Sequence, residues 1–468
     1  MIIMLNIIKS ASAIIRKSTG EVYLGLRSKN LRTFPNFWVF PGGKIDEQLN
    51  ENWMGTEKEV IDTIIRELYE EIGLVFGYDK IFEANDRKRD IDEIPYDMQL
   101  RSELIKNMSY IGKKDTPPFT KNVYSAAYYY IKSEIFDYID PIVDGQELVE
   151  GQWIMPKTAI KHWIEGKILL PPPILHLLKK IDDENFVEIS REETFLPVGF
   201  QTKIEIYPDI QIIPIASSTI KPFFNTNLII IEGKNNYILI DPGANDEGKE
   251  HLKLILKNLN KIPIIFLTHH HYDHWEGVDI IEEFYPDTII YAHEKTNSKI
   301  KTSLKKINVN DNFIFDIGDT KYHVVELLGH TNGHIGLLND KNNVLISGDH
   351  IVGVGSTVLD HKNGSMIDYM ATCEKIKQLP LELILPSHGP PIFDPKNLIL
   401  KYIDHRKERE AEILRIINDG VTSIDDMLRL CYQDTPLDML SFAKRNLILH
   451  INKLIIENKV KETILIQD

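Results

Sequence analysis

The chain has 468 residues and a mass of 54.0 kDa, about three times the length of a typical domain, so more than one hydrophobic core is expected. Charged residues (26%) and hydrophobic residues (43%) are close to the averages for soluble globular proteins, which argues against disorder and fibrous repeats. The formal net charge is −15, so a nucleic-acid partner would need a local basic patch or metal ions to hold it.

The cysteine content and the apolar segments bear on location. Two cysteines, Cys373 and Cys431, cannot build a disulfide framework, and neither has a CxxC partner. The apolar residues 1–8 are interrupted by Asn6 and fall far short of the ~20 residues that span a bilayer. We therefore expect a cytoplasmic protein with no membrane partner; the sequence does not indicate an oligomeric state.

The first 180 residues mix strand and helix patterns. Residues 10–28 alternate apolar and polar side chains on both sides of a turn at residues 18–20, which predicts two antiparallel strands. Residues 57–72 carry apolar side chains at helical spacing, and Gly73 follows as a stop signal, so we expect a helix there.

Three glutamates gather at the end of this predicted helix. Glu70 and Glu71 follow Glu67 at spacings that bring the three carboxylates to one side of a helix. Like charges this close repel one another, which makes sense if a divalent cation neutralises them, and hard oxygen ligands favour magnesium or manganese. A solvated acidic helix face is the alternative interpretation.

The pattern around these glutamates is longer than the cluster itself. Pro41-Gly42-Gly43 lies upstream, and residues 66–74 run in the order Arg, Glu, apolar, any, Glu, Glu, any, Gly, apolar. Together these segments resemble the Nudix hydrolase box, over about residues 8–182. The resemblance implies an α/β/α sandwich as a first domain, residues 1–185, that hydrolyses a nucleoside diphosphate derivative. It places metal on Glu67, Glu70 and Glu71, with Glu67 and Glu70 as catalytic carboxylates.

Two features depart from the Nudix pattern. The family has a glutamate eight residues before the arginine, where this chain has Lys58. The distance from Gly43 to Arg66 is also longer than usual, because residues 46–55 form an insertion. A first domain that binds a ligand without hydrolysing it is therefore kept as an alternative.

A second core is expected after a linker at residues 186–203. Short apolar runs at residues 228–231, 237–240 and 262–267 predict strands. The last two are apolar almost throughout, which is typical of strands buried on both faces between covering helices. We expect this domain to span residues 204–396.

A histidine-rich loop follows the last of these strands. His269 and His271 are alternate residues, so both can bind one ion, while Asp273 and His274 can turn toward a second. Imidazole and carboxylate ligands suit zinc, with iron and manganese as alternatives. Three later segments also combine an apolar run, a glycine and a candidate ligand: His330, Asp349 and His388.

These four segments in this order resemble the metallo-β-lactamase superfamily, over about residues 204–396. The resemblance implies an αββα sandwich with two zinc ions at one sheet edge. It assigns His269, His271 and His330 to the first metal, Asp273, His274 and His388 to the second, and Asp349 to a bridge between them.

The resemblance also bears on the reaction. Two cations would lower the pKa of a water toward ~7, and Asp273 and Asp349 are the catalytic residues expected there. Asp241 would support the metal loop. True lactamases generally carry a cysteine in place of the bridging aspartate, so cleavage of a thioester or a phosphodiester is favoured over antibiotic hydrolysis. His334, His350 and His361 lie near the ligand loops and are either supporting groups or ordinary structural histidines.

Residues 397–468 are expected to be mainly helical, with helices at residues 398–418, 423–431 and 437–458. This part resembles the winged-helix module of endoribonucleases related to β-lactamase-like protein 2. That likeness implies phosphate contacts to single-stranded RNA. The basic residues concerned are Arg406, Lys407, Arg409, Lys444 and Arg445. The alternative is that these side chains pair with neighbouring glutamates.

The sequence therefore predicts a multidomain α/β protein with two metal-dependent hydrolase sites. The first would act on a nucleotide-type diphosphate, with magnesium or manganese. The second would cleave RNA or another phosphodiester with two zinc ions, and a thioesterase resembling glyoxalase II is the alternative.

Overall fold

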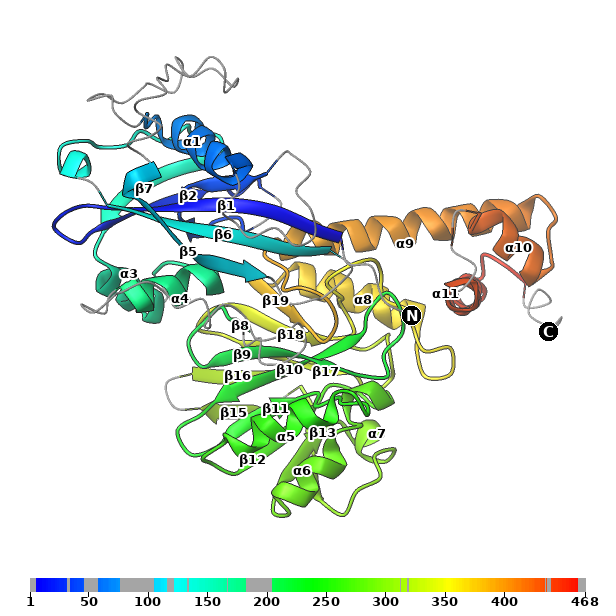
Figure 1. Ribbon diagram of the computed structural model, residues 1–468. Coiled ribbons are helices and arrows are strands. Elements are labelled where there is room, and N and C mark those ends of the chain that lie inside the picture. Colours follow the sequence, from blue (N-terminus) through cyan, green and yellow to red (C-terminus); the bar gives the residue numbers. More distant parts are fainter. Residues whose placement is uncertain are drawn as a thin grey trace. The chain divides into compact units, whose positions relative to one another are not determined.

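The computed structural model describes residues 6–31, 34–45, 58–75, 105–115, 122–132, 134–165, 167–181, 204–311, 313–317, 320–433, 435 and 439–461. The predicted linker at residues 186–203 and the insertion at residues 46–55 lie outside these residues. The chain divides into two compact units, residues 1–211 and 212–468 (Figure 1). Among the described residues, no helix is both long enough and apolar enough to cross a bilayer.

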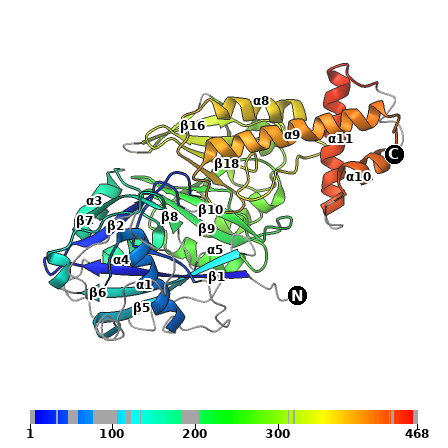
Figure 2. The same ribbon diagram turned by 90° about the horizontal axis from the view of Figure 1, so that it is seen from above.

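The first unit is built on a seven-stranded mixed sheet. Strand β1 (Asn6–Arg16) pairs in parallel with β6 and antiparallel with β2 and β4; β1 and β6 lie side by side along their lengths (Figure 2). The other strands are β2 (Val22–Arg27), β3 (Trp38–Val39), β4 (Gly42–Lys44), β5 (Met108–Asp115), β6 (Asn122–Lys132) and β7 (Leu148–Ile154). The strand pair predicted around residues 18–20 is confirmed by the pairing of β1 with β2.

Helices cover both faces of this sheet. Because side chains alternate along β1, Ala13 and Ile15 belong to the core under α1 (Lys58–Ile72), and Ile14 belongs to the core on the opposite face. That opposite core is covered by α3 (Pro156–Ile164) and α4 (Pro172–Ile181). The unit is the α/β/α sandwich that the Nudix resemblance implied.

Helix α1 begins one residue after the predicted start and ends where predicted. Its buried side chains include Val60, Ile64 and Leu68, which share one helical face. Gly73 has a φ of +71°, a conformation that glycine adopts without steric cost, and the Leu74 N–H donates to the Leu68 carbonyl at 3.0 Å. This turn ends the helix directly after the three glutamates.

The second unit contains most of a seven-stranded sheet, whose strand β8 and the first two residues of β9 precede residue 212, and a five-stranded sheet. The first runs in the order β14-β13-β12-β11-β10-β9-β8. Its strands are β8 (Ile204–Glu205), β9 (Ile210–Ala216), β10 (Asn225–Glu232), β11 (Tyr237–Ile240), β12 (Pro263–Leu267), β13 (Ile289–Ala292) and β14 (Lys305–Asn308). The second has β15 (Ile314–Ile317), β16 (Thr320–Glu326), β17 (Ile335–Asn339), β18 (Val344–Gly348) and β19 (Leu383–Pro386), in that order.

The two sheets pack face to face. Phe315 on β15 contacts Phe266 on β12, with ring centroids 5.9 Å apart, and Tyr291 on β13, at 5.1 Å. On its outer face the first sheet is covered by α5 (Lys249–Lys257) and α6 (Val278–Phe284), which share a core with β11 and β12. All four residues of β11 are buried, because this strand has the second sheet on one side and helices on the other.

Helices also cover the outer face of the second sheet. Helices α8 (Met366–Lys377) and α9 (Pro395–Asn418) lie side by side there and share a core with β18 and β19 (Figures 1 and 2). The layers are therefore helix, sheet, sheet, helix, the αββα order expected from the sequence.

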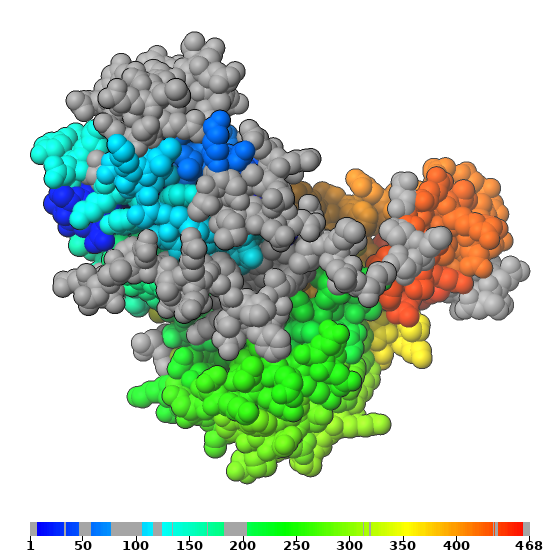
Figure 3. Space-filling view, viewed as in Figure 1, coloured from blue at the N-terminus to red at the C-terminus, as the bar shows by residue number. Residues whose placement is uncertain are grey.

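The C-terminal residues form a small helical module. It consists of the second half of α9, α10 (Ile424–Cys431) and α11 (Leu440–Ile456), coloured orange to red in Figure 3. Ile413, Met427 and Leu447 meet in its own core. Each of the three predicted helices begins and ends within three residues of the observed one. Most of the residues after α11 lie outside the described part of the chain.

Candidate metal centres

The loop after β12 brings three imidazoles to one point. β12 ends at Leu267, and the next two residues are fully buried. His269 Nε2 lies 2.9 Å from His271 Nδ1. His330 Nε2, from the loop between β16 and β17, lies 3.2 Å from the first of these nitrogens and 3.1 Å from the second.

A second group of candidate ligands lies beside the first. Asp273 and His274 lie on the short 3-10 turn η5 (Tyr272–His274), and His388 follows β19. Asp273 Oδ2 is 3.3 Å from His388 Nε2, and Asp273 Oδ1 is 3.8 Å from His274 Nε2. The Asp273 side chain is 16% exposed and that of His274 is fully buried, so the solvent-facing side of this group is the carboxylate.

Asp349 follows β18 directly and reaches both groups. Its Oδ2 lies 3.4 Å from His274 Nε2 and 3.8 Å from His330 Nε2. Its Oδ1 lies 3.3 Å from His388 Nε2. One carboxylate therefore faces the first group with one oxygen and the second group with both.

Hydrogen bonds on the far side of the imidazoles fix which nitrogen carries a lone pair. His274 Nδ1 lies 2.8 Å from an oxygen of Asp241, and His388 Nδ1 lies 2.9 Å from the Asn225 carbonyl oxygen. Carboxylates and carbonyls only accept, so each imidazole donates there. In their neutral forms both rings therefore present Nε2 to the cluster without a proton.

The same reasoning holds for two imidazoles of the first group, those of His269 and His271. Thr268 Oγ1 gives its single proton to Asp241 at 2.7 Å, so it accepts from His269 Nδ1 at 3.1 Å. His271 Nε2 lies 3.4 Å from Asp360 Oδ2 and donates to it. The lone pairs of His269 Nε2 and His271 Nδ1 then face one another, an arrangement that a cation between them would stabilise. The donors fit divalent metal ions, and imidazole with carboxylate suits zinc.

Burial and charge act differently on the two groups. Burial, with neighbouring imidazoles, lowers the pKa of His330 to about 3. At His388 burial disfavours the charged form, but the carboxylates of Asp349 and Asp273 outweigh it and raise the pKa to about 10. At Asp349 burial is outweighed by the imidazoles of His388 and His274, which hold its pKa well below the usual range. The carboxylate therefore stays ionised and available to a cation.

The glutamates of the first unit face the glycine loop. A Cβ atom on Gly43 would lie 2.0 Å from Glu67 Oε1, so only glycine leaves room for this carboxylate. The Gly42 N–H donates to Glu71 Oε2 at 2.8 Å. The Pro-Gly-Gly segment and the end of α1, far apart in the sequence, thus form one site.

Two of the three glutamates are buried, which makes the interpretation as a solvated acidic face wrong. Glu67 is 7% exposed and Glu71 is 2% exposed. Burial and the nearby Glu67 charge raise the pKa of Glu71 well above its usual value, and Glu71 Oε1 has no hydrogen-bond partner among the described residues. Arg66 lies 3.0 Å from Glu67 and 3.3 Å from Glu70. A buried, partly unpaired set of carboxylates fits a hard cation such as magnesium.

Lys58, the departure from the Nudix pattern, lies away from these carboxylates. Its side chain is 71% exposed, and its ammonium group is 3.9 Å from Asp62 on the same helix.

Models of three protein families match the chain. The metallo-β-lactamase superfamily matches residues 222–388, the NUDIX domain matches residues 7–165, and a β-lactamase-associated winged helix domain matches residues 423–464. A β-lactamase-like protein 2 homolog of Caenorhabditis elegans is 31% identical over 257 residues, which cover 51% of this chain and 85% of the relative. The chain belongs to the metallo-β-lactamase superfamily. Its first unit is a Nudix domain, and together the two make it a metal-dependent hydrolase.

Two further proteins are similar to parts of this superfamily member. A hydroxyacylglutathione hydrolase of Prochlorococcus marinus (strain NATL1A) is 32% identical over 158 residues, 33% of this chain and 60% of the relative. The crystal structure of a β-lactamase domain protein from Burkholderia ambifaria aligns with a TM-score of 0.50 at 16% identity, over 57% of this chain and 92% of that one. This second likeness supports the fold.

Asp241 holds the metal loop of this metallo-β-lactamase domain. It is fully buried and accepts hydrogen bonds from the Thr268 N–H at 2.9 Å and from the Thr268 and Ser387 hydroxyls at 2.7 Å, besides the His274 contact. It therefore joins the loop after β12 to the loop after β19.

The three histidines near the ligand loops have different surroundings. His334 is buried, and its Nε2 accepts the Asp349 N–H at 3.1 Å, so it supports Asp349. His350 is also buried and lies 3.7 Å from Cys373 Sγ. The His361 side chain is 44% exposed and lies 3.8 Å from Asp360.

Sequence reasoning missed Asp360, which contacts His271 and lies 3.7 Å from His270. It also missed Asn225 and Ser387, which support ligand loops through single hydrogen bonds. Asp360 and Asn225 reach the cluster from segments distant in the sequence, whereas Ser387 directly precedes His388 and is distant only from Asp241, the residue it contacts. Asp360 had one weak signal, since it precedes His361 in a polar turn.

The prediction that Arg406 contacts phosphates is wrong. Arg406 is 3% exposed, and its guanidinium donates to the Thr357 carbonyl and lies 5.3 Å from the Tyr369 ring. Three other basic side chains of the predicted track have carboxylate partners: Lys407 with Glu374 at 3.6 Å, Arg409 with Glu412 at 2.7 Å and Lys444 with Asp425 at 3.0 Å.

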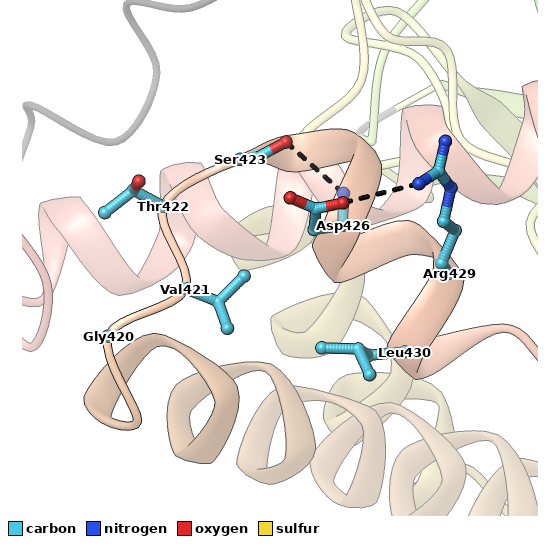
Figure 4. A pocket seen from close by; sticks show the side chains of 7 residues that line it. All are labelled: Gly420, Val421, Thr422, Ser423, Asp426, Arg429 and Leu430. Atoms are coloured by element: carbon cyan, nitrogen blue, oxygen red, sulfur yellow. Dashed lines mark hydrogen bonds and ion pairs between the residues drawn. The ribbon is translucent and has the colours of Figure 1, made fainter.

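A surface pocket lies at the turn between α9 and α10 (Figure 4). Its lining residues are Gly420, Val421, Thr422, Ser423, Asp426, Arg429 and Leu430. Arg429 lies 3.6 Å from Asp426, so the one basic group in this lining faces an acidic one. The pocket has no net charge that would attract a phosphate.

Proposed function

We propose that the second unit cleaves phosphodiester bonds, with RNA as the first substrate to test, at two divalent metal ions. His269, His271 and His330 would hold one ion, and Asp273, His274 and His388 would hold the other. The observation that carries this proposal is the placement of Asp349, whose two oxygens lie 3.3 to 3.8 Å from imidazole nitrogens of both groups. Two such cations would activate a water and stabilise the charge of a reacting phosphate.

The chain's own residues would position these ions and exchange protons near them. Asp349 would fix the spacing of the two positions, and Asp273, at the solvent-facing side, would accept a proton from the attacking water. The position of Lys299 favours an anionic substrate, because its exposed ammonium group lies 3.0 Å from His270 Nε2, beside the ligand loop. The winged helix match also favours a nucleic acid, since helix-turn-helix modules commonly bind one.

A thioesterase is the second candidate for this unit. The likeness to a hydroxyacylglutathione hydrolase favours it, although that likeness covers 33% of the chain. The carboxylate pairing of Lys407, Arg409 and Lys444 also leaves fewer free cations for RNA.

A direct comparison of substrates tests the two candidates. The full-length protein with zinc or manganese is incubated with labelled single-stranded RNA and, separately, with S-lactoylglutathione, beside an Asp273→Ala, His274→Ala variant. We expect RNA fragments with the native protein and at least a 10²-fold lower cleavage rate with the variant, because one metal position is lost. Intact RNA together with release of free thiol would replace the first candidate with the second.

For the Nudix domain we propose hydrolysis of nucleoside diphosphate derivatives, with magnesium or manganese on Glu67, Glu70 and Glu71. The buried, partly unpaired Glu71 carboxylate supports a cation there. The cytoplasmic location that we propose is supported by Cys373 and Cys431, which are both unpaired and buried.

Glu70→Gln is expected to lower turnover of such diphosphates by about 10²-fold or more, because the variant loses a metal-binding charge while it keeps its size. Release of nucleoside monophosphate, measured over a panel of diphosphate derivatives, checks this. Glu150→Gln, at a solvent-exposed position on β7, is the matched control and should leave turnover unchanged. If the native protein binds members of the panel but hydrolyses none, the Nudix domain is a ligand-binding module.

A further inference from the structure

Residues 357–360 form a short segment between β18 and α8, which we name the strap. The three residues before it are exposed, whereas Thr357 and Leu359 within it are 2% and 0% exposed. The Thr357 hydroxyl donates to the His350 carbonyl at 3.1 Å. The chain therefore returns from the surface and packs the strap close to the metal-ligand loops.

One side of the strap contacts two candidate ligands of the first metal position. The Asp360 N–H donates to the His330 carbonyl at 3.0 Å, and Asp360 Oδ2 lies 3.4 Å from His271 Nε2. His271 faces the other imidazoles with Nδ1, so a proton on Nε2 is required for it to bind metal. The Asp360 carboxylate is the group that holds this proton in place.

Asp360 is itself held firmly at the end of the strap. Its Oδ1 accepts the Lys362 N–H, and its Oδ2 accepts the Asn363 side-chain amide, both at 2.9 Å. Its carbonyl accepts the Gly364 N–H at 2.7 Å. A carboxylate fixed by so many bonds can fix the orientation of its imidazole partner in turn.

The other side of the strap is held by the C-terminal helices. The guanidinium of Arg406 on α9 donates to the Thr357 carbonyl. The Leu359 N–H donates to Oδ1 of Asn446 on α11 at 3.2 Å. Arg406 and Asn446 are 3% and 8% exposed, so water does not readily replace either bond.

We propose that helices α9 and α11, through Arg406 and Asn446, are positioning elements of the metal centre. Arg406 and Asn446 hold the strap, and through Asp360 the strap holds His271 in the tautomer that binds metal. This inference rests on the proposed role of His271 as a ligand, and it is independent of which substrate the site hydrolyses. Arg406 and Asn446 are both buried, so contact with RNA does not explain them, whereas holding the strap does.

Cobalt binding to the full-length protein tests the proposal. The metal is removed with a chelator, and cobalt(II) is titrated back while its visible absorption reports affinity and ligand geometry. We expect Asp360→Ala to weaken binding at the first position by roughly 10- to 100-fold, the range typical for loss of a group that orients a metal ligand. Asp360→Asn keeps one oxygen acceptor for His271 but turns its NH2 toward the Lys362 N–H, so it should recover most but not all of the native affinity.

Asn446→Ala should change cobalt affinity in the same direction, by about tenfold, and alter the absorption spectrum. Asn452→Ala, the same substitution farther along α11 at a half-buried position, should change neither. Circular dichroism confirms that each variant is folded; if Asn446→Ala does not fold, Asn446→Ser takes its place with the same expectation. Native cobalt affinity in a folded Asp360→Ala or in the folded Asn446 variant would overturn the proposal. Substrate turnover is not part of this readout, so failure of the RNA proposal leaves it intact.

Discussion

Asp349→Asn is expected to lower turnover at the second unit by roughly 10³-fold, the largest effect of any single substitution considered. The variant keeps the size of the side chain but removes the one carboxylate that faces both ligand groups. Transition-state stabilisation by bound metal is worth several kcal/mol, and each 1.36 kcal/mol corresponds to a factor of ten in rate. The measurement is the rate on whichever substrate the native protein hydrolyses, together with the metal content per chain.

The metal content separates a bridging role from a general disturbance of the fold. We expect Asp349→Asn to lose about one of two bound ions while its thermal unfolding temperature in the chelated state stays near the native value. Asp316→Asn on β15, an exposed position, is the matched control. A variant that retains two ions and native turnover would show that Asp349 does not bridge.

Asp241→Ala is expected to destabilise the second unit by about 3–5 kcal/mol, the cost of removing one partner from a buried charged network. Asp241 is fully buried, and its loss leaves the Thr268 N–H, His274 Nδ1 and the Ser387 hydroxyl without their acceptor. For a unit of this size the change corresponds to a fall of roughly 10 °C in the unfolding temperature. Differential scanning calorimetry of the chelated protein measures it.

Two further variants show whether the cost comes from the lost acceptor. Asp241→Asn keeps the volume but turns an amide NH2 toward groups that donate, so it should recover only part of the stability. Asp246→Ala in the same unit has a side chain that is 99% exposed and should shift stability by less than about 0.5 kcal/mol. An unfolding temperature for Asp241→Ala within a degree of the Asp246→Ala value would contradict the structural role.

The site also shows how a ligand set is built from strand ends. His269 follows β12, Asp349 follows β18 and His388 follows β19, so three strands supply ligands where each strand stops. β12 and β18 have strand neighbours on both sides, which gives the loops that follow them fixed starting points, whereas β19 is the last strand of its sheet and pairs with β18. The glutamates of α1 depend instead on helical spacing, with Gly73 ending the helix directly after them.

The sequence predicted those features that depend on short spacing. Val60, Ile64 and Leu68 recur at helical intervals, and the run at residues 237–240 is apolar throughout, so α1 and the buried strand β11 were predictable. The Nudix and metallo-β-lactamase patterns are also local, since each joins a ligand to the strand or helix that carries it. The prediction for Arg406 was wrong for the opposite reason, because the exposure of a basic side chain on a helix depends on how that helix packs against the rest of the fold.

The amino-acid order by itself predicted the two hydrolase folds and the candidate ligands through its resemblance to the Nudix and metallo-β-lactamase patterns, because motif spacing is a property of neighbouring residues. The tertiary structure alone decided how those ligands are supported. Asp360 reaches His271 across 89 positions, and Asn446 reaches the strap across 87. Such contacts arise from the packing of helices and sheets, which no short window of sequence records. The same packing made Arg406 an internal support and left Lys58 in solvent.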